Sequence, residues 1–187
     1  MMLDRREFVA ELLKDRGDLL VVTGLGAPTY DVAAVSEHSL NFYLWGAMGS
    51  AAMIGLGLAL AQPTRRVVVI TGDGEMLMGL GALATIGVKQ PANLAIAVID
   101  NRHYGETGMQ ASHTDAGIDL TAIAKACKFP STHAVSALGE IADVRRLIHA
   151  GAGPIFIQAH VKAEDLPRVL PTRDGQEIKF RFMAALK

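Results

Sequence analysis

The fold of this chain is decided by residues 65–105, RRVVVITGDGEMLMGLGALATIGVKQPANLAIAVIDNRHYG. Residues 67–71 (VVVIT) are continuously apolar and mostly β-branched, which is the pattern of a parallel strand buried on both faces. The GDG at 72–74 follows, and its glycines allow the backbone to turn sharply and to approach a ligand closely. Apolar residues recur at helical spacing over residues 75–89, and residues 94–99 form a second buried strand. The stretch therefore predicts a strand–helix–strand unit of a parallel sheet.

Two polar residues follow these strands at the points where the strands end. Asp73 comes after the first strand and Asn101 after the second. Parallel neighbours end at the same carboxyl-terminal edge of a sheet, where open α/β sheets bind ligands. A carboxylate and an amide oxygen suit Mg²⁺, and the amides of Gly74 and Glu75 open a helix whose N-terminus attracts a phosphate. Two ordinary turns are the alternative, but the pairing at consecutive strand ends favours a ligand site.

Four longer motifs narrow the chemistry: NFYLWGAMG at 41–49, GLG at 55–57, GDGEMLMGLGALATIG at 72–87 and DNRHYGETG at 100–108. GDG with an Asn after the next strand resembles the diphosphate-binding signature of thiamine-diphosphate enzymes. Together the motifs resemble the sulfopyruvate decarboxylase β subunits and the matching domain of phosphonopyruvate decarboxylases, and the similarity extends over residues 19–161. It implies the thiamine-diphosphate-binding fold, as the diphosphate-binding domain, with thiamine diphosphate and Mg²⁺ as cofactors.

The resemblance also assigns roles to individual residues. Mg²⁺ would be held by the side chains of Asp73 and Asn101 and by the main-chain carbonyl of His103. The residues expected at the diphosphate are Gly26, Ala27, Gly72, Gly74, Glu75, Tyr104 and Gly105. Met48 would wedge between the two rings of the cofactor and donate its amide to the pyrimidine, and the Gly46 carbonyl would accept from the 4′-amino group. Without the resemblance, Met48 would be ordinary packing, since Met fills gaps well.

One part of the expected active site is missing from this chain. Enzymes of this type use a glutamate beside the pyrimidine ring, and that glutamate comes from a separate pyrimidine-binding domain. Nothing in the sequence resembles that domain, and Glu37 and Glu75 are poor substitutes because of their positions. We therefore expect a partner α subunit that carries the pyrimidine-binding domain and the catalytic Glu, in an α₂β₂ or larger assembly.

The substrate is expected to be a small anionic 2-oxo acid of the sulfopyruvate or phosphonopyruvate type. Such a substrate calls for cationic or donor groups near the reacting carbon. The candidates are His38, Arg102, His103, Gln110 and His113. Of these, His113 lies in a small polar loop after the diphosphate site that is suited to closing over substrate, so it joins Met48 as a candidate catalytic residue.

Other functions remain open from the sequence alone. The same cofactor could serve an acetolactate-synthase-like carboligase or an acyl-transfer enzyme. The chain could also be a non-catalytic cofactor-binding or regulatory subunit. A Mg²⁺-dependent phosphohydrolase would need further carboxylates near Asp73, and the sequence offers none at suitable spacing.

The rest of the chain predicts a doubly wound α/β fold, with a mainly parallel sheet and helices on both faces. The expected helices are 3–16, 119–127 and 138–150, and the expected strands are 19–23, 133–135 and 154–161. The GLG at 24–26 does not complete a dinucleotide fingerprint, because Thr29 stands where Gly or Ala is needed. We expect one domain over residues 1–187, whose C-terminal tail, 162–187, packs on a partner.

Composition excludes several classes of protein. Half of the 187 residues are hydrophobic and the net charge is −1, which argues against a disordered or a nucleic-acid-binding chain. The single cysteine, Cys127, excludes an internal disulfide and fits the reducing cytoplasm, and the first residues lack the apolar run of a secretion signal, so we expect a cytoplasmic protein. Residues 42–61 carry no charge, but four glycines interrupt them, so they favour a buried helix or a subunit interface over a membrane span.

Overall fold

The computed structural model describes residues 2–187, which form a six-stranded sheet with every neighbouring pair of strands parallel. The strand order is β2-β1-β3-β4-β8-β7, so the chain changes direction across the sheet between β1 and β3. The strands are β1 (Leu20–Thr23), β2 (Asn41–Tyr43), β3 (Val67–Gly72), β4 (Leu94–Asp100), β7 (Ser131–Val135) and β8 (Ile155–His160). In doubly wound folds a ligand binds at such a switch point, outside the carboxyl ends of the strands.

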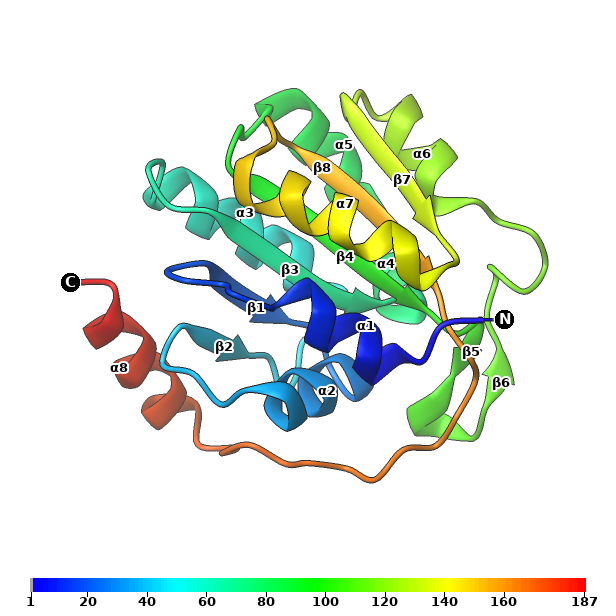
Figure 1. Cartoon of the computed structure of the whole chain (residues 1–187), viewed down its shortest axis with the longest axis horizontal. Coiled ribbons are helices and arrows are strands. Elements are labelled where there is room, and N and C mark those ends of the chain that lie inside the picture. The colour runs from blue at the N-terminus through cyan, green and yellow to red at the C-terminus, as the bar shows by residue number, and fades with distance from the viewer. Residues whose placement is uncertain (1) are drawn as a thin grey trace.

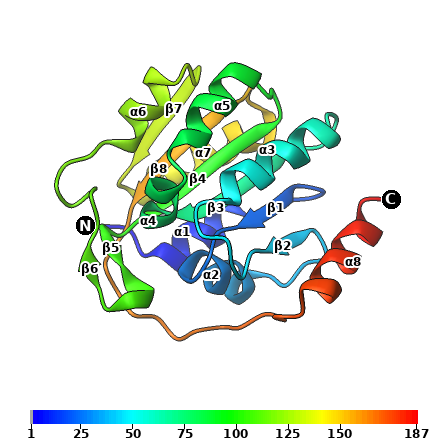
Figure 2. The same ribbon diagram turned by 180° about the vertical axis from the view of Figure 1, so that it is seen from behind.

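Helices cover both faces of the sheet (Figures 1 and 2). One face carries α1 (Arg5–Leu12), α2 (Ala27–Val35) and α7 (Leu138–Ala150). The other carries α3 (Ala51–Ala61), α4 (Asp73–Met78), α5 (Gly81–Lys89) and α6 (Leu120–Ala126). Apolar side chains of the helices and of the sheet bury each other in two core clusters, one on each face. The predicted doubly wound, parallel α/β fold is confirmed.

Two predicted helices differ from the observed ones. The helix expected over residues 3–16 is the shorter α1, because Leu3 instead pairs with Val161 and Asp15 has a positive φ of 54°. The helix expected over residues 75–89 is two helices, α4 and α5. They separate at Gly79, whose Cβ position lies 2.0 Å from the Gly49 carbonyl oxygen, so the loop before α3 presses against this point.

The uncharged segment of residues 42–61 is divided between β2, a loop and the eleven residues of α3. No helix within residues 2–187 is both long and apolar enough to cross a membrane. α2 was not anticipated from the sequence, and neither was a small antiparallel hairpin, β5 (His103–Tyr104) with β6 (Gln110–Ala111), which includes the short helix η1 (Gly105–Thr107).

The tail packs on this chain. Residues 162–174 run as an extended segment below the sheet, and α8 (Gly175–Ala185) lies against β2 at its edge (Figure 1). Phe182 is buried and meets Phe42 edge-on at 5.6 Å between ring centroids. Trp45 Nε1 donates to the Thr172 carbonyl at 2.7 Å. Phe180, in contrast, is 62 % exposed, so the sequence-based expectation that the tail packs on a partner misses the self-contacts of Phe182.

Candidate functional site

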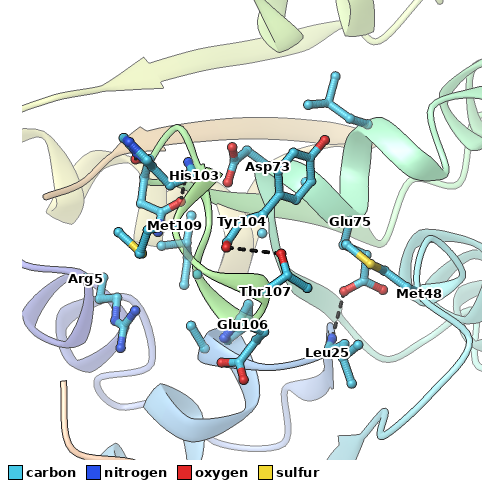
Figure 3. Close-up of a pocket in the computed structure, with 18 of the residues that line it drawn as sticks. Arg5, Leu25, Met48, Asp73, Glu75, His103, Tyr104, Glu106, Thr107 and Met109 are labelled. Carbon is cyan, nitrogen blue, oxygen red and sulfur yellow. Dashed lines mark hydrogen bonds between the residues drawn. The ribbon is translucent and has the colours of Figure 1, made fainter. Parts of the chain in front are cut away.

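A cavity of about 750 Å³ opens at the carboxyl edge of the sheet. The segments that follow β1, β3 and β4 line it, together with the start of α1 and part of the extended tail. Figure 3 shows the hairpin that carries Tyr104 and Met109 near its centre, with Asp73 behind it and Met48 and Glu75 to one side. The cavity therefore lies at the switch point of the strand order, where the fold favours a ligand.

Asp73 is the most deeply placed acid of the cavity. It is 2 % exposed, its Oδ2 accepts from Ser112 Oγ at 2.5 Å, and the same oxygen lies 3.2 Å from Thr114 Oγ1. Burial raises the pKa of Asp73 from its ordinary value, and the nearby Asp100 adds to the rise. Both hydroxyl contacts fall on the same oxygen, which leaves Oδ1 available to a ligand.

A polar network joins the ends of β3 and β4. The Thr114 hydroxyl lies 2.8 Å from Asp100 Oδ1 as well as 3.2 Å from Asp73 Oδ2. Asp100 is fully buried and also accepts from Gln158 Nε2 at 2.7 Å. No ion pair within residues 2–187 joins either acid to a Lys or Arg, and His160 approaches Asp100 at 3.4 Å. Two buried acids that share one hydroxyl and lack a strong cation are an environment that favours a bound metal ion.

Asn101 and His103 lie in the turn that follows β4. The Asn101 Oδ1 accepts from the His103 amide at 3.0 Å, and His103 Nδ1 lies 2.9 Å from the Asn101 carbonyl oxygen. Gly72 pairs with Ile99 in the sheet register, so the turns that carry Asp73 and Asn101 start from neighbouring strand ends. The sequence-based expectation that these two residues lie at the same edge agrees with this placement.

The Glu75 side chain ties three loops together. Its Oε2 accepts from the Leu25 amide at 2.7 Å, and its Oε1 accepts from the Gly49 amide at 3.3 Å. Burial raises the pKa of Glu75, while these amide hydrogen bonds oppose the rise. A Cβ at Gly24 would lie 2.1 Å from Glu75 Oε2, so a larger residue at this position would displace the Glu75 carboxylate. Sequence reasoning gave Glu75 a main-chain role alone and missed this bridging carboxylate.

The segment after β4 folds over the start of α4. A Cβ at Gly74 would lie 2.4 Å from the Tyr104 ring, so the glycine lets the ring rest on the backbone. The Tyr104 hydroxyl is 3.4 Å from His113 Nδ1. The Met109 amide donates to the Tyr104 carbonyl at 3.0 Å and closes the hairpin. These contacts bring His113 to the cavity wall, although it lies nine positions beyond Tyr104.

Most of the sequence-predicted residues line this cavity. They are Ala27, Met48, Gly72, Asp73, Gly74, Glu75, Asn101, His103, Tyr104, Gly105 and His113. The other predicted residues are not among those that line the cavity: Gly26, His38, Gly46, Arg102 and Gln110. Gly26 has a φ of 76° at the start of α2, and its Cβ position lies 2.8 Å from Glu106 Cγ.

Sequence reasoning missed several residues of the site. Arg5, Tyr30, Thr107, Met109 and Arg168 line the cavity, and Ser112 and Thr114 bind Asp73 from behind. Arg5 and Arg168 come from the two ends of the chain, so no local motif signals them. Ser112 and Thr114 occupy an ordinary polar loop, and only the folded structure shows that they are buried against Asp73.

Comparison with known proteins identifies the family of this chain. The C-terminal TPP-binding domain of thiamine pyrophosphate enzymes matches residues 24–159. The chain belongs to this family. The thiamine pyrophosphate match confirms the family inferred from the motifs, and it includes Asp73, Asn101 and Met48.

Two curated relatives are similar over almost the whole chain. The sulfopyruvate decarboxylase subunit beta of Methanothermobacter thermautotrophicus is 38% identical, and the alignment covers 100% of this chain and 97% of the relative. The phosphonopyruvate decarboxylase of Streptomyces viridochromogenes is also 38% identical, with 94% of this chain and 43% of the relative covered. This chain therefore spans less than half of the second relative.

A solved structure shows the same fold. It is an X-ray structure described as a thiamin diphosphate-dependent enzyme from Mycobacterium smegmatis, with a TM-score of 0.72 and 20% identity. The match covers 86% of this chain and 32% of that one.

The donor set of the cavity fits a magnesium diphosphate. Residues 2–187 contain no cluster of three or more His, Cys, Asp or Glu side chains placed to hold a metal ion. The expected ligands are instead one carboxylate, one amide oxygen and one carbonyl oxygen, from Asp73, Asn101 and His103. Mg²⁺ is commonly bound by one or two carboxylates, with water and substrate phosphates filling its other positions. The residues present therefore suit a metal that arrives with a diphosphate.

Proposed function

We propose that this chain is the β subunit of a thiamine-diphosphate- and Mg²⁺-dependent decarboxylase of a small anionic 2-oxo acid. A separate pyrimidine-binding subunit completes its active site. The observation that carries the proposal is the buried Asp73 at the switch point of the sheet, next to the Asn101 turn and without a Lys or Arg partner within residues 2–187. The sulfopyruvate and phosphonopyruvate decarboxylases among its relatives support the substrate class.

Each residue has a task in this proposal. Asp73, Asn101 and the His103 carbonyl would hold Mg²⁺. The main chain around Gly26, Gly74 and Tyr104 would hold the diphosphate oxygens. The cofactor, when bound, supplies the electron sink for decarboxylation, and the protein supplies position and electrostatics.

Met48 and His113 serve the reacting end. Met48 is 38 % exposed at the cavity wall, on a loop whose neighbours Ala47 and Gly49 both have positive φ. That loop is anchored through Gly49 to Glu75, so Met48 is presented by a fixed backbone and can wedge the cofactor rings. His113, held near the Tyr104 hydroxyl, is placed to donate a proton or bind an anionic group.

The carboxylates of the cavity support a role for a partner. Glu75 is bound to two main-chain amides, Glu106 pairs with Arg168 at 3.5 Å, and Glu164 pairs with Lys162 at 3.6 Å. Asp73 is assigned to the metal, and Asp165 is solvent-exposed. A glutamate for the pyrimidine ring would therefore come from another subunit. We infer an α₂β₂ or larger assembly, in line with relatives named as beta subunits.

The test uses the chain co-expressed with a pyrimidine-binding α-type subunit. CO₂ release is measured with sulfopyruvate, phosphonopyruvate and pyruvate, with and without an aldehyde acceptor, so that carboligation is seen as a different product. Thiamine diphosphate binding with Mg²⁺ is measured by calorimetry for the wild type, Asp73→Asn and the control Asp115→Asn, an exposed acid near the same loop. We expect binding to be lost in Asp73→Asn alone. Unchanged binding in Asp73→Asn would refute the metal assignment, and efficient turnover by the chain alone would refute the need for a partner.

A further inference from the structure

The extended tail brings one arginine, Arg168, to the cavity wall (Figure 1). The tail is fastened to the rest of the chain on both sides of this residue. On one side, Arg6 Nη2 donates to the Pro167 carbonyl at 2.9 Å. On the other side, Trp45 Nε1 donates to the Thr172 carbonyl at 2.7 Å. The tail therefore presents the Arg168 guanidinium at a defined place beside the cavity.

Arg168 meets an acid that the hairpin carries. Its Nη2 lies 3.5 Å from Glu106 Oε2, and the Tyr30 hydroxyl lies 3.5 Å from the same oxygen. The Arg168 guanidinium also lies over the Tyr30 ring, with Cζ 5.8 Å from the ring centroid, which favours a cation. Burial raises the pKa of Tyr30, and the Glu106 charge adds to the rise, so the hydroxyl keeps its proton beside the carboxylate. The charge of Glu106 is thus countered by the tail.

Glu106 lies between two loops that are expected to hold the diphosphate. It directly follows Gly105, and its Cγ lies 2.8 Å from the Cβ position of Gly26. In Figure 3 its carboxylate lies below the hairpin and away from Met48, so it is at the diphosphate end of the cavity and not at the reacting end. The diphosphate and Asp73 together carry more negative charge than one Mg²⁺ offsets. A further carboxylate at this end would therefore oppose cofactor binding unless a cation accompanies it.

Few cations are available for this task. Among residues 2–187, Arg5 and Arg168 are the only Lys or Arg side chains that line the cavity. Arg5 is already paired with the buried Asp31, with 3.0 Å between Arg5 Nε and Asp31 Oδ2. Arg168 is the one of the two that contacts Glu106. The charge of Glu106 therefore depends on a single residue of the tail.

We propose that Arg168 neutralises Glu106 and so keeps the diphosphate end of the cavity favourable to the cofactor, and this inference rests on the proposed function. Arg168 is a positioning residue that acts through Glu106. Both side chains are exposed to solvent, so their contact contributes little to the stability of the free chain. Its effect appears when the diphosphate brings further negative charge next to Glu106. The extended tail then has a specific role, which is to supply this positive charge.

The test measures thiamine diphosphate binding in the presence of Mg²⁺, by titration calorimetry of the complex with the α subunit. The variants are Arg168→Gln, Glu106→Gln and the two combined. The matched control is Arg173→Gln, which removes the same charge from the same tail. Arg173 also lies over an aromatic ring, with Cζ 5.1 Å from the Trp45 centroid, but it does not line the cavity. Thermal melting without cofactor verifies that each variant is folded.

We expect Arg168→Gln to weaken cofactor binding by about tenfold, because it leaves an unopposed carboxylate near the diphosphate. This loss should shrink at high salt, which screens exposed charges. Arg173→Gln should bind as the wild type does. Glu106→Gln should bind as tightly as the wild type or more tightly, and the double variant should bind as Glu106→Gln does. A tail that only braced the fold would not regain binding through Glu106→Gln.

Three results would overturn the role of Arg168: wild-type affinity in Arg168→Gln, a double variant that stays weakened, or weaker binding by Glu106→Gln alone. Failure of the proposed function would have a different appearance. A complex that binds the cofactor in the expected pattern but releases no CO₂ from any 2-oxo acid would refute the decarboxylase and leave the role of Arg168 standing. An active complex in which Arg168→Gln binds the cofactor normally would do the reverse, and a wild-type complex that binds no cofactor would refute both.

Discussion

Replacing Thr114 by Val tests whether the network behind Asp73 holds two buried acids together. Valine keeps the shape of the side chain and removes the hydroxyl that lies 2.8 Å from Asp100 Oδ1 and 3.2 Å from Asp73 Oδ2. A hydroxyl has one hydrogen, so it donates to the nearer acid, and Thr114 is 7 % exposed, so water does not readily replace it. A hydrogen bond to a charged group contributes about 1.5–3 kcal/mol, and the lower end applies because Asp100 also accepts from Gln158.

The assay is urea unfolding of the chain in EDTA, which removes any metal that would hide the loss. We expect the free energy of unfolding of Thr114→Val to fall by about 1.5–2 kcal/mol, and the melting temperature by about 3–8 °C for a chain of this size. Thr114→Ser keeps the hydroxyl and should recover most of the loss. Thr107→Val, which removes an exposed hydroxyl bound to Gln110, should stay within about 0.5 kcal/mol of the wild type. A Thr114→Val protein as stable as the wild type would refute the reasoning.

Three further predictions test other parts of the structure. Gly24→Ala should destabilise the chain and weaken cofactor binding, since a Cβ at position 24 would lie 2.1 Å from Glu75 Oε2. The control Gly139→Ala, inside α7, places its Cβ where no other atom lies within 4 Å, so it should leave cofactor binding unchanged and leave stability unchanged or improved. Burial raises the pKa of Tyr43 to about 12, so the tyrosine ionises first in the unfolded chain; relative to Tyr43→Phe, the wild type should therefore lose about 3 kcal/mol of stability between pH 10 and pH 12 in urea titrations at each pH. Phe182→Ala should cost about 3–4 kcal/mol in unfolding experiments if α8 is anchored on this chain, and an unchanged stability would show that the tail is not anchored there.

The fold could be predicted because the strands are buried on both faces. Residues 67–71 and 94–99 read as continuous apolar runs with clear ends, and the structure contains them as β3 and β4. The failures come from long-range contacts. Nothing near Gly79 predicts the helix break, which depends on the Gly49 carbonyl arriving from another loop. Likewise, the position of α8 depends on Phe182 reaching Phe42, far away in sequence.

The residues of the site could be predicted only where a sequence motif contains them. Asp73 and Asn101 follow consecutive strands, so strand order alone places them together. Thr114 and Ser112 bind Asp73 across a loop, and polar loop residues give no sign of which will be buried. Arg168 reaches the cavity only because the tail crosses below the sheet (Figure 1). Local sequence patterns therefore predicted the turns proposed to bind the ligand, whereas the residues that support these turns come together only in the folded chain.

The Asp73→Asn variant separates two effects of this carboxylate, one on cofactor binding and one on the stability of the free chain. In the free chain, burial and the neighbouring Asp100 both raise the pKa of Asp73, so its charged form is disfavoured there. An asparagine keeps an oxygen for the Ser112 hydroxyl and has no charge to bury, so the free variant should be more stable than the wild type by about 1–2 kcal/mol at pH 7. Bound cofactor stabilises only a chain that binds it, so Mg²⁺ and thiamine diphosphate should raise the melting temperature of the wild-type complex and not that of the variant. A variant that is less stable when free, and that still gains stability from the cofactor, would mean that Asp73 is a structural residue and not a metal ligand.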